Sequence, residues 1–321
     1  MLKHIGEPEL DISVVLPVYN EAGNLEVFIP ELSAMLRELG RSYEIIAVDD
    51  GSKDESVPTL RRLKAGEPNL RIIRFRRNFG QTAGFAAGFD LARGRYVVTM
   101  DADGQNDPAD LPKLLKVMEE GEYDIVSGWR QHRKEPFFSR RLPSMMANRI
   151  IGKSTGITLH DYGCSLKIYH RDVAKNVNLY GELHRFIPAL ASGIGVRITE
   201  VPVNDRPRRY GKSKYNLTKT IRVILDLVTV SFLLTYMARP MQLFGLAGIL
   251  SGGAGFLLAL YLTAVKIFTR ADIGSRPLLS LAILLMILGV QFLVMGLLGE
   301  LMVRTYFEVQ DKPIYMIRSE E

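Results

Sequence analysis

The sequence Tyr96-Val97-Val98-Thr99-Met100-Asp101-Ala102-Asp103-Gly104-Gln105 decides the fold that we expect for this chain. It begins as a short apolar strand and ends in carboxylate and carboxamide side chains. Because side chains alternate along an extended chain, Asp101, Asp103 and Gln105 can lean to the same side. Their oxygen atoms suit a hard divalent cation, Mg²⁺ or Mn²⁺. An isolated Asp-x-Asp is more often a polar turn, so a metal site is expected only if neighbouring strands also end in polar groups.

The stretch belongs to a series of short β-rich runs that alternate with helical segments. Five runs are expected as strands: Ile12–Pro17, Glu44–Asp49, Leu70–Phe75, Tyr96–Asp101 and Asp124–Gly128. This alternation predicts an α/β fold with a mostly parallel sheet, covered on both faces, whose ligands bind beyond the carboxyl ends of the strands. The first run leads into Pro17-Val18-Tyr19-Asn20-Glu21 and the second into Asp49-Asp50-Gly51-Ser52. Polar strand ends on one edge of one sheet predict a cleft.

Arginines follow two of these runs. Arg74-Phe75-Arg76-Arg77 stands before a glycine-rich helix start at Gly80, and Arg130 follows the fifth run. Arginine beside a helix start suits an anionic group, although a solvated basic edge is an equally good interpretation of these residues alone.

The overall composition limits the classes of binding partner that we expect. The chain has 321 residues, and 41 Lys and Arg against 35 Asp and Glu give a net charge of +6. This excess is too small to indicate nucleic acid, but it suits an anionic membrane surface or a phosphate-bearing substrate. A single cysteine, Cys164, excludes an intrachain disulfide. The first twenty residues contain three acidic residues and no apolar core of signal-peptide length, so we expect the amino-terminal region in the cytoplasm.

The last third of the chain is expected to meet a membrane. Pro240 to Val265 and Pro277 to Gly299 contain 26 and 23 residues without a charge, enough for two spanning helices. Two crossings place both termini on the cytoplasmic side of the inner membrane. Gly248 and Gly252 permit close helix packing, either within the chain or between subunits.

A basic, amphipathic region precedes these spans. The strand-like Val201-Pro202-Val203 leads into a dense basic loop that ends near Lys214. From Leu217 the apolar and charged residues separate onto two faces, as in a helix lying in the headgroup layer or one packed against the soluble domain. The chain is therefore divided into an α/β domain (1–213), interfacial helices (214–238), two membrane-spanning helices (239–304) and a cytoplasmic tail (305–321).

Five motifs in this order resemble those of the inverting glycosyltransferases of family 2. They are Pro17-Val18-Tyr19-Asn20-Glu21, Asp49-Asp50-Gly51-Ser52, Arg77-Asn78-Phe79-Gly80, Asp101-Ala102-Asp103-Gly104-Gln105 and Arg208-Arg209-Tyr210-Gly211-Lys212-Ser213-Lys214. More narrowly, the chain is similar to polyprenyl-phosphate glycosyltransferases that carry two carboxyl-terminal membrane helices. The resemblance implies a Rossmann-like GT-A fold, a nucleotide-sugar donor, Mg²⁺ or Mn²⁺, and a polyprenyl phosphate acceptor. It covers essentially the whole chain.

The resemblance also assigns roles to positions of this sequence. It implies that the nucleotide-sugar site contains Pro17, Tyr19, Glu21, Asp49, Asp50, Arg77, Asp101 and Arg130. Asp101, Asp103 and Gln105 would hold the metal and diphosphate, and Arg208, Ser213 and Lys214 would hold the acceptor phosphate. Asp161 matches an acidic position and would join Asp101, Asp103 and Arg208 as a catalytic residue. Because a phosphate monoester is already largely anionic at neutral pH, we expect Asp161 to orient the acceptor or an arginine rather than act as a base.

The resemblance implies inverting transfer of one sugar to undecaprenyl or dolichyl phosphate at the cytoplasmic membrane face. UDP-glucose is the expected donor, followed by GDP-mannose and UDP-N-acetylglucosamine, and relatives suggest a tetramer. One alternative is a processive polysaccharide synthase, although Trp129 follows Gly128 and the Gln-x-x-Arg-Trp motif of those enzymes is absent. Another is a non-catalytic, nucleotide-binding membrane scaffold or translocator, for which two spans are few.

Overall fold

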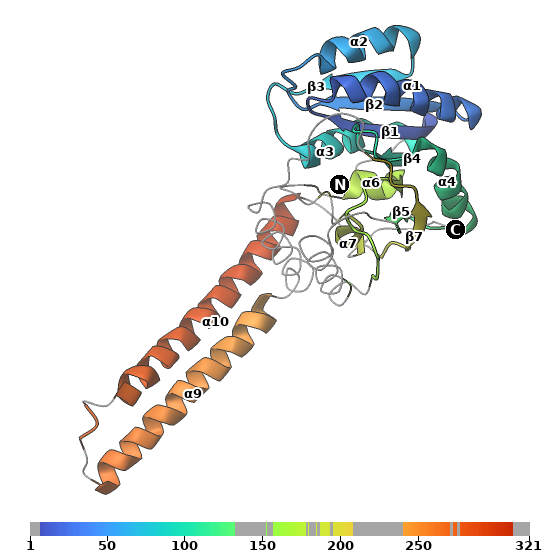
Figure 1. Cartoon of the computed structure of the whole chain (residues 1–321). Helices are drawn as coiled ribbons and strands as arrows, with labels where there is room; N and C mark the ends of the chain where they lie inside the picture. The colour runs from blue at the N-terminus through green and yellow to red at the C-terminus, as the bar shows by residue number, and fades with distance from the viewer. Residues whose placement is uncertain are drawn as a thin grey trace. The chain divides into compact units, whose positions relative to one another are not determined.

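A computed structural model of the chain describes residues 7–131, 152, 157–177, 179, 184, 187–192, 195–207, 240–269, 272–274 and 277–310. The chain divides into two compact units, an α/β unit that extends to Ser231 and a helical unit that begins at Phe232. Figure 1 shows the elements of each unit with their labels.

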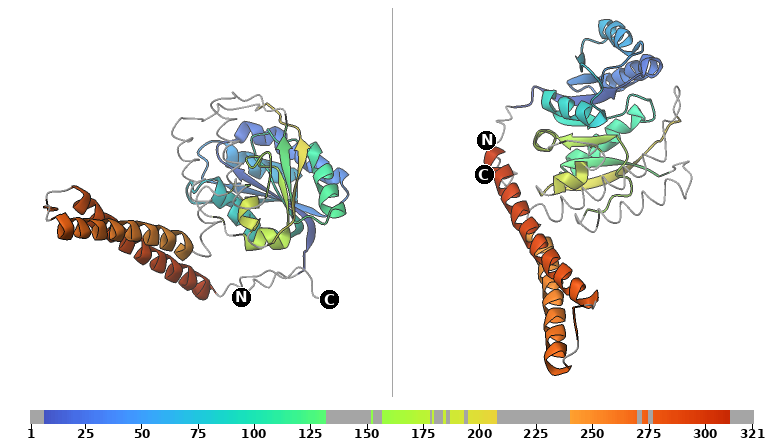
Figure 2. Two further views of the ribbon diagram at one scale, coloured as in Figure 1. Left: turned by 90° about the horizontal axis from the view of Figure 1, so that it is seen from below. Right: turned by 90° about the vertical axis from the view of Figure 1, so that its left-hand side faces the viewer.

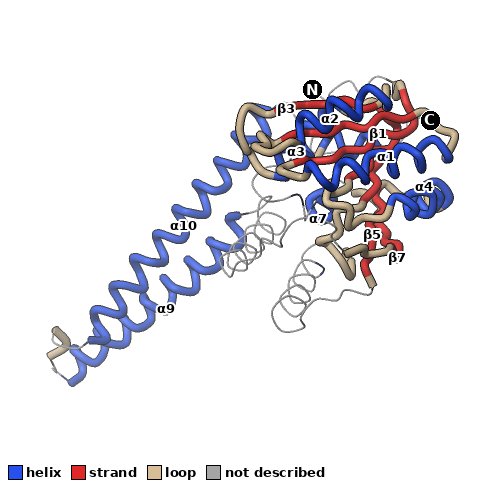
Figure 3. Tube along the Cα trace, turned by 45° about the horizontal axis from the view of Figure 1, so that its top comes forward, coloured by secondary structure: helices blue, strands red, loops and turns tan. Residues whose placement is uncertain are grey.

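The α/β unit is built on one mixed sheet of seven strands in the order β3-β2-β1-β4-β6-β5-β7. The strands are β1 (Leu10–Val18), β2 (Tyr43–Asp49), β3 (Leu70–Arg74), β4 (Gly94–Thr99), β5 (Ile125–Arg130), β6 (Lys167–His170) and β7 (Ile198–Val203). Only β6 is antiparallel to its neighbours β4 and β5, and the other pairs are parallel. Figure 3 shows the strands of this sheet in red. The predicted mostly parallel sheet is confirmed, and the five predicted strands are present with ends shifted by at most two residues.

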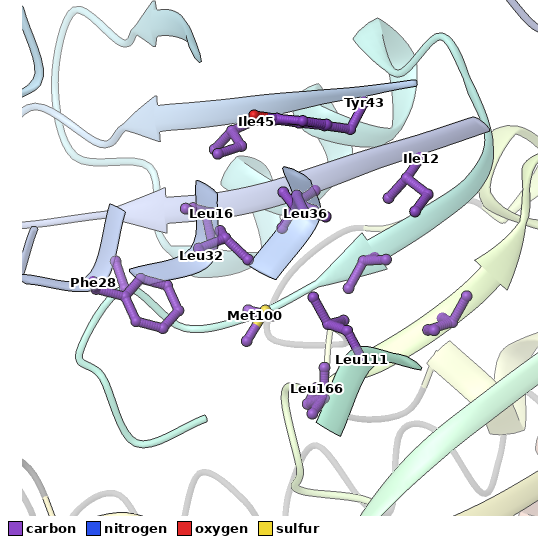
Figure 4. Packing of buried hydrophobic residues seen from close by; sticks show 14 of the residues in the cluster. Ile12, Leu16, Phe28, Leu32, Leu36, Tyr43, Ile45, Met100, Leu111 and Leu166 are labelled. Atoms are coloured by element: carbon purple, nitrogen blue, oxygen red, sulfur yellow. The ribbon is translucent and has the colours of Figure 1, made fainter. Parts of the chain in front are cut away.

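Helices cover both faces of this sheet (Figure 2). Those of the α/β unit are α1 (Ala22–Glu38), α2 (Ser56–Gly66), α3 (Gln81–Leu91), α4 (Leu111–Glu120), α6 (Arg171–Asn176) and α7 (Ile187–Ser192), with a 3₁₀ turn η1 (Pro108–Asp110) before α4. Helices α1, α2 and α4 contribute to one apolar cluster and α3, α6 and α7 to the other. Alternate residues of β1 enter the two clusters: Leu16 packs with Leu32 of α1 (Figure 4), while Val15 faces Phe85 of α3.

The direction of the strands positions the polar residues. Because the other six strands run the same way, their carboxyl ends lie at one edge of the sheet. The antiparallel β6 begins at that edge, so the segment from Asp161 to Leu166 that leads into it also lies there. The carboxyl ends of six strands and the start of β6 therefore lie at one edge of the sheet.

At the opposite ends of these strands, the buried carboxylate of Glu44 in β2 forms hydrogen bonds that link β1, β2, β3 and the start of β4. Its side chain is 1% exposed. It accepts hydrogen bonds from Ser13 Oγ at 2.7 Å, from Arg71 Nη1, and from the backbone N and Nη2 of Arg93 at 2.8 and 3.1 Å. Burial raises the pKa of Glu44, but these hydrogen bonds outweigh burial and lower its pKa overall. The ionised carboxylate therefore stabilises the sheet.

The helical unit consists of α9 (Pro240–Thr269) and α10 (Pro277–Gln310). Both are long and apolar enough to cross a membrane. Large apolar side chains such as Ile249, Phe256, Ile287 and Leu298 are exposed along them. A core helix of a soluble protein would bury such residues, so exposure favours the predicted spanning helices.

Glycines allow α9 and α10 to approach each other closely. A Cβ atom on Gly289 of α10 would lie 2.7 Å from the Cα of Gly252, and one on Gly248 would lie 2.8 Å from the carbonyl oxygen of Gly289. Ser251 Oγ donates a hydrogen bond to the Leu285 carbonyl at 3.0 Å. Of the two alternatives that the sequence left open for Gly248 and Gly252, packing within one chain accounts for both residues.

Replacing Glu44 with Gln should lower the free energy of unfolding by about 1–3 kcal/mol at pH 7, because Arg71 and Arg93 lose an anionic acceptor. The folded-state pKa is depressed, so this stabilisation is present above the ordinary pKa of a glutamate and is lost as the pH falls through the folded-state value. The free energy of unfolding of the detergent-solubilised wild type and variant, measured at several pH values, tests this prediction. Glu119→Gln, which removes a half-exposed partner of Arg41, is the control and should cost less than about 1 kcal/mol. Equal losses in the two variants would contradict the role of Glu44.

Gly289→Leu should destabilise the helical unit by about 1–3 kcal/mol, because the added side chain cannot fit against the Gly252 backbone. Thermal unfolding in detergent, followed by circular dichroism, measures the loss. Gly253→Leu is the matched control, since no atom lies within 4 Å of a Cβ at that position. A larger loss in the control would show that the glycine contact is unimportant.

Candidate functional site

A cavity of about 530 Å³ lies beyond the carboxyl ends of β1, β2 and β3. Its lining residues come from the three segments that follow these strands: Tyr19, Gly51, Ser52, Lys53, Arg74, Phe75, Arg76, Arg77 and Asn78. Four of them are cationic and none is acidic. The predicted positions Tyr19 and Arg77 therefore share one cavity, and its charge suits an anionic ligand.

Asp49 provides a buried acceptor beside this cavity. Its Oδ1 accepts a hydrogen bond from Ser52 N at 3.2 Å, and its Oδ2 lies 4.0 Å from Arg74 Nε. Among the residues that the structure describes, Oδ2 is buried without a hydrogen-bond partner. Buried polar atoms in native proteins are nearly always hydrogen-bonded, so this oxygen is a candidate acceptor for a donor group on a bound ligand.

Asp50 shapes the cavity rather than lining it. Its Oδ1 and Oδ2 accept hydrogen bonds from the backbone N atoms of Phe79 and Gly80, at 2.6 and 2.9 Å. The adjacent Gly51 has φ +69°, and a Cβ there would lie 2.7 Å from the carbonyl carbon of Arg77. Asp50 and Gly51 thus hold the arginine-bearing segment against the end of β2. Whether Asp50 also contacts a nucleoside stays a prediction.

The segment after β1 is fixed by its neighbours. Asn20 adopts φ +57°, donates its backbone N–H to Ser52 Oγ at 3.0 Å, and accepts from the Lys53 N–H at 2.8 Å. Glu21 accepts a hydrogen bond from Asn24 Nδ2, and Pro17 lies against Gly84 of α3. Pro17 and Glu21, predicted to surround a nucleoside, thus form the frame of the cavity, whereas Tyr19 lines it. Sequence analysis missed Lys53, whose position follows only from these contacts.

The carboxylates of Asp101 and Asp103 lie close together beyond β4. Asp101 Oδ1 accepts from Gln81 Nε2 at 2.5 Å, and Asp103 Oδ1 accepts from Gln105 N at 3.1 Å. Burial raises the pKa of Asp101, and the charge of Asp103 raises it further. A divalent cation between two such carboxylates would relieve their repulsion, and Mg²⁺ commonly binds through one or two carboxylates together with substrate phosphates.

This donor set fits a metal that also uses ligands from outside the protein. Within the described residues, no three His, Cys, Asp or Glu side chains are grouped so that they could hold a metal ion. Asp101, Asp103 and the carboxamide of Gln105 are oxygen donors of the kind that Mg²⁺ and Mn²⁺ accept. The part of Gln105 in the metal site remains a prediction.

Arg130, at the carboxyl end of β5, and Asp161, in the segment that leads into β6, form a largely buried ion pair. Arg130 Nε and Nη2 donate to the two oxygens of Asp161 at 2.9 and 3.3 Å, and Gly163 N donates to Oδ1 at 3.0 Å. The side chains are 17% and 3% exposed. Burial lowers the pKa of Arg130, but the charge of Asp161, its hydrogen bonds and other nearby groups together outweigh burial and raise the pKa overall. Asp161 therefore pairs with an arginine, and its predicted role in orienting that arginine or the acceptor stays a prediction.

Further contacts join this pair to the carboxylate loop. Asn106 Oδ1 accepts hydrogen bonds from Asp101 N at 2.9 Å and Ser165 Oγ at 2.8 Å. The buried Lys167 Nζ donates to the carbonyls of Tyr162 and Cys164, and burial lowers its pKa. No motif pointed to Asn106 or Lys167, whose hydrogen bonds are seen only in the folded chain.

The aromatic end of β5 packs beside the ion pair. Trp129 stacks on His160 with 4.3 Å between ring centroids, and His160 Nδ1 contacts Glu200 of β7. The remaining predicted residues, Arg208, Ser213 and Lys214, lie outside the described part of the chain, as does the predicted interfacial region 214–238.

Comparison with known proteins places this geometry among sugar-transferring enzymes. Residues 13–177 match glycosyl transferase family 2. The chain is 43% identical over 312 residues to dodecaprenyl-phosphate galacturonate synthase of Rhizobium johnstonii, covering 96% of this chain and 92% of that protein. It is 40% identical over 310 residues to undecaprenyl-phosphate 4-deoxy-4-formamido-L-arabinose transferase of Yersinia enterocolitica, with coverage of 96% and 92%.

A solved structure shares the fold. Glucosyl-3-phosphoglycerate synthase of Mycobacterium tuberculosis, in complex with Mn²⁺ and uridine-diphosphate-glucose, superposes with a TM-score of 0.52 at 17% identity. The match covers 70% of this chain and 79% of that chain. It confirms the GT-A fold that the sequence predicted.

Asp161→Asn and Arg130→Gln should each lower the free energy of unfolding by about 2–4 kcal/mol, because each leaves a buried group without its charged partner. The double variant should lose less than the sum of the two single losses, and the difference measures the coupling between the side chains. Denaturant unfolding of all four proteins in detergent gives this value. Strictly additive losses would contradict the ion pair.

Proposed function

The chain belongs to glycosyl transferase family 2, and from that premise we propose that it transfers one sugar from a nucleoside diphosphate to a polyprenyl phosphate. The main support for this proposal is the similarity to two relatives whose names contain dodecaprenyl phosphate and undecaprenyl phosphate. Each similarity covers 96% of the chain. That span includes both apolar helices as well as the α/β unit. A processive synthase or a non-catalytic scaffold would not account for this similarity.

The expectation of glucose is corrected, because both relatives are named for other sugars. We propose galacturonate or a 4-deoxy-4-formamido-L-arabinose type of sugar instead. Motifs common to the whole family could not distinguish these sugars, since they describe the binding of the diphosphate and metal.

The donor would bind with its nucleoside diphosphate in the cationic cavity. Lys53, Arg74, Arg76 and Arg77 would offset the phosphate charges, as guanidinium groups do in phosphate sites. Asp49 Oδ2, which has no hydrogen-bond partner among the described residues, would accept a hydrogen bond from an N–H of the base. This arrangement supports a nucleotide donor without identifying its base.

The metal-binding role falls to Asp101 and Asp103. Either Mg²⁺ or Mn²⁺ would offset the charge that develops on the departing diphosphate. Gln81 and Asn106 hold the loop by hydrogen bonds to the Asp101 side chain and backbone N–H. Asp101 would thus be positioned before a donor arrives.

The acceptor would attack the anomeric carbon from the side opposite the diphosphate, which inverts the configuration. Asp161 is poorly placed to act as a base, because its oxygens already accept hydrogen bonds from Arg130 and Gly163. We assign it instead to orienting Arg130 toward a phosphate group. Arg208, Ser213 and Lys214 remain the proposed ligands of the acceptor phosphate.

The membrane supplies the acceptor. A polyprenyl chain stays within the bilayer, so its phosphate lies at the surface, and α9 and α10 would anchor the enzyme there. We propose the inner membrane, with the α/β unit on the cytoplasmic side. The proposed tetramer needs other contacts than Gly248 and Gly252, which pack within the chain.

Incubating the detergent-purified chain with undecaprenyl phosphate and a panel of nucleotide sugars tests the proposal. UDP-galacturonate and UDP-4-deoxy-4-formamido-L-arabinose should yield one sugar per lipid in the presence of Mg²⁺ or Mn²⁺, and UDP-glucose should not. EDTA should abolish transfer, and Asp103→Asn should lower kcat/KM at least about a hundredfold. Asp172→Asn, which alters an exposed partner of His170, is the matched control and should retain the wild-type rate. A polymer would indicate a processive synthase; nucleotide binding without transfer would indicate a scaffold.

A further inference from the structure

Phe79 is an exposed aromatic residue next to the cationic cavity. It is 54% exposed, more than any other large apolar residue in the described part of the α/β unit. The four residues before it, Phe75 to Asn78, line the cavity, whereas Phe79 does not. The role of the ring therefore depends first on the protein groups that it contacts.

One of these groups is the guanidinium of Arg77. Its Cζ atom lies 4.5 Å from the centroid of the Phe79 ring, within the range of about 6 Å over which a cation is attracted to an aromatic face. Among the residues that the structure describes, this guanidinium forms no hydrogen bond and no ion pair. The ring thus holds Arg77 while its N–H donors stay available to a ligand.

Arg74, which lines the same cavity, is held in a different way. Its Nε lies 4.0 Å from Oδ2 of the buried Asp49, so a carboxylate already offsets part of its charge. A carboxylate orients an arginine but also competes with a phosphate for it, whereas a neutral ring leaves the positive charge to the ligand. Within the described structure, Arg77 therefore combines a defined position with an uncompensated charge.

The Phe79 ring has supports of its own. Its backbone N–H donates to Oδ1 of the buried Asp50 at 2.6 Å. The ring meets that of Phe75 edge to face, with 5.7 Å between centroids and 87° between planes, a favourable geometry for aromatic pairs. Phe75 in turn packs against the apolar cluster to which α3 contributes. These contacts connect the exposed ring to the core, so it can serve as a fixed support for Arg77.

We propose that Phe79 is a positioning residue that holds Arg77 ready for the donor diphosphate. The inference rests on the proposed function, because it assumes that the cavity binds this diphosphate. A free arginine side chain samples many rotamers and loses them when it binds a phosphate. An arginine that already lies on a ring loses fewer, so the same hydrogen bonds give tighter binding. Phe79 acts through Arg77 and does not contact the donor.

Isothermal titration calorimetry of the detergent-purified full chain with UDP and with inorganic pyrophosphate, each in the presence of Mg²⁺, tests the proposal. Phe79→Leu keeps an apolar side chain but removes the ring, so it should weaken both ligands by the same factor, about threefold to fivefold, the size of an exposed cation–π contact. Phe79→Tyr keeps the ring and should bind both ligands with wild-type affinity. Thermal unfolding of both variants should match that of the wild type, because the substituted side chain is exposed.

A double-variant cycle with Arg77 separates positioning from a general effect on the fold. Arg77→Met should weaken UDP binding about tenfold, because a charge-assisted hydrogen bond is lost. In the Arg77→Met background, Phe79→Leu should change UDP affinity less than about 1.5-fold, since the ring has no cation left to hold.

Tyr123→Leu is the matched control. It removes the ring that Arg197 contacts, with 5.4 Å between Cζ and the ring centroid. Both residues precede strands, Tyr123 before β5 and Arg197 before β7, so this cation–π contact lies at the opposite ends of the strands from the cavity. The affinity of the control for UDP should equal that of the wild type.

The outcomes distinguish this inference from the proposed function. Unchanged UDP affinity in Phe79→Leu, or an equal loss in the wild-type and Arg77→Met backgrounds, would overturn the positioning role and leave the proposed function intact. A loss for UDP with none for pyrophosphate would show that the ring contacts the nucleoside, and would overturn that role as well. A wild-type chain that binds neither ligand would overturn the proposed diphosphate site, and the inference with it.

Discussion

Parallel hydrogen bonding between β1 and its neighbours β2 and β4 is the constraint on which the rest of the α/β unit depends. It aligns the carboxyl ends of the central strands, and buries their apolar residues between two helical layers. Asp49 and Asp101 reach one edge for this reason, and Arg130 reaches it because β5 and β4 are both antiparallel to β6. The antiparallel β6 adds Asp161 to that edge by starting where the other strands end.

Charge is distributed unevenly along this edge. Arginines and a lysine line the cavity beyond β1 to β3, whereas carboxylates follow β4. Arg130 and Asp161 neutralise each other, but Asp101 and Asp103 repel, and one oxygen of Asp49 has no hydrogen bond in the described structure. A nucleotide and a cation would add partners for these groups. At the opposite ends of the strands, the carboxylate of Glu44 is already paired with two arginines and a serine.

Sequence analysis predicted the features that follow from local periodicity: the parallel strands, their polar ends and the two apolar helices. It missed β6, because four residues carry too little pattern and their pairing depends on distant strands. It also missed Lys53 and Gln81, whose contacts are with residues that follow other strands, and Lys167, whose buried amino group donates to two nearby carbonyls. The pairing of Arg130 with Asp161 spans 31 positions, and no motif encodes it. The sugar was predicted wrongly because the motifs that carried the resemblance are common to the family and do not identify a sugar.

The stacked pair of Trp129 and His160 at the end of β5 provides an intrinsic fluorescence probe. Trp129 is the only tryptophan of the chain, and it stands one residue before the arginine that pairs with Asp161. Its indole lies against an imidazole, a ring whose protonation quenches nearby emission, and that imidazole contacts Glu200. Tryptophan fluorescence of the unlabelled protein therefore originates from a single, assignable place beside the candidate site.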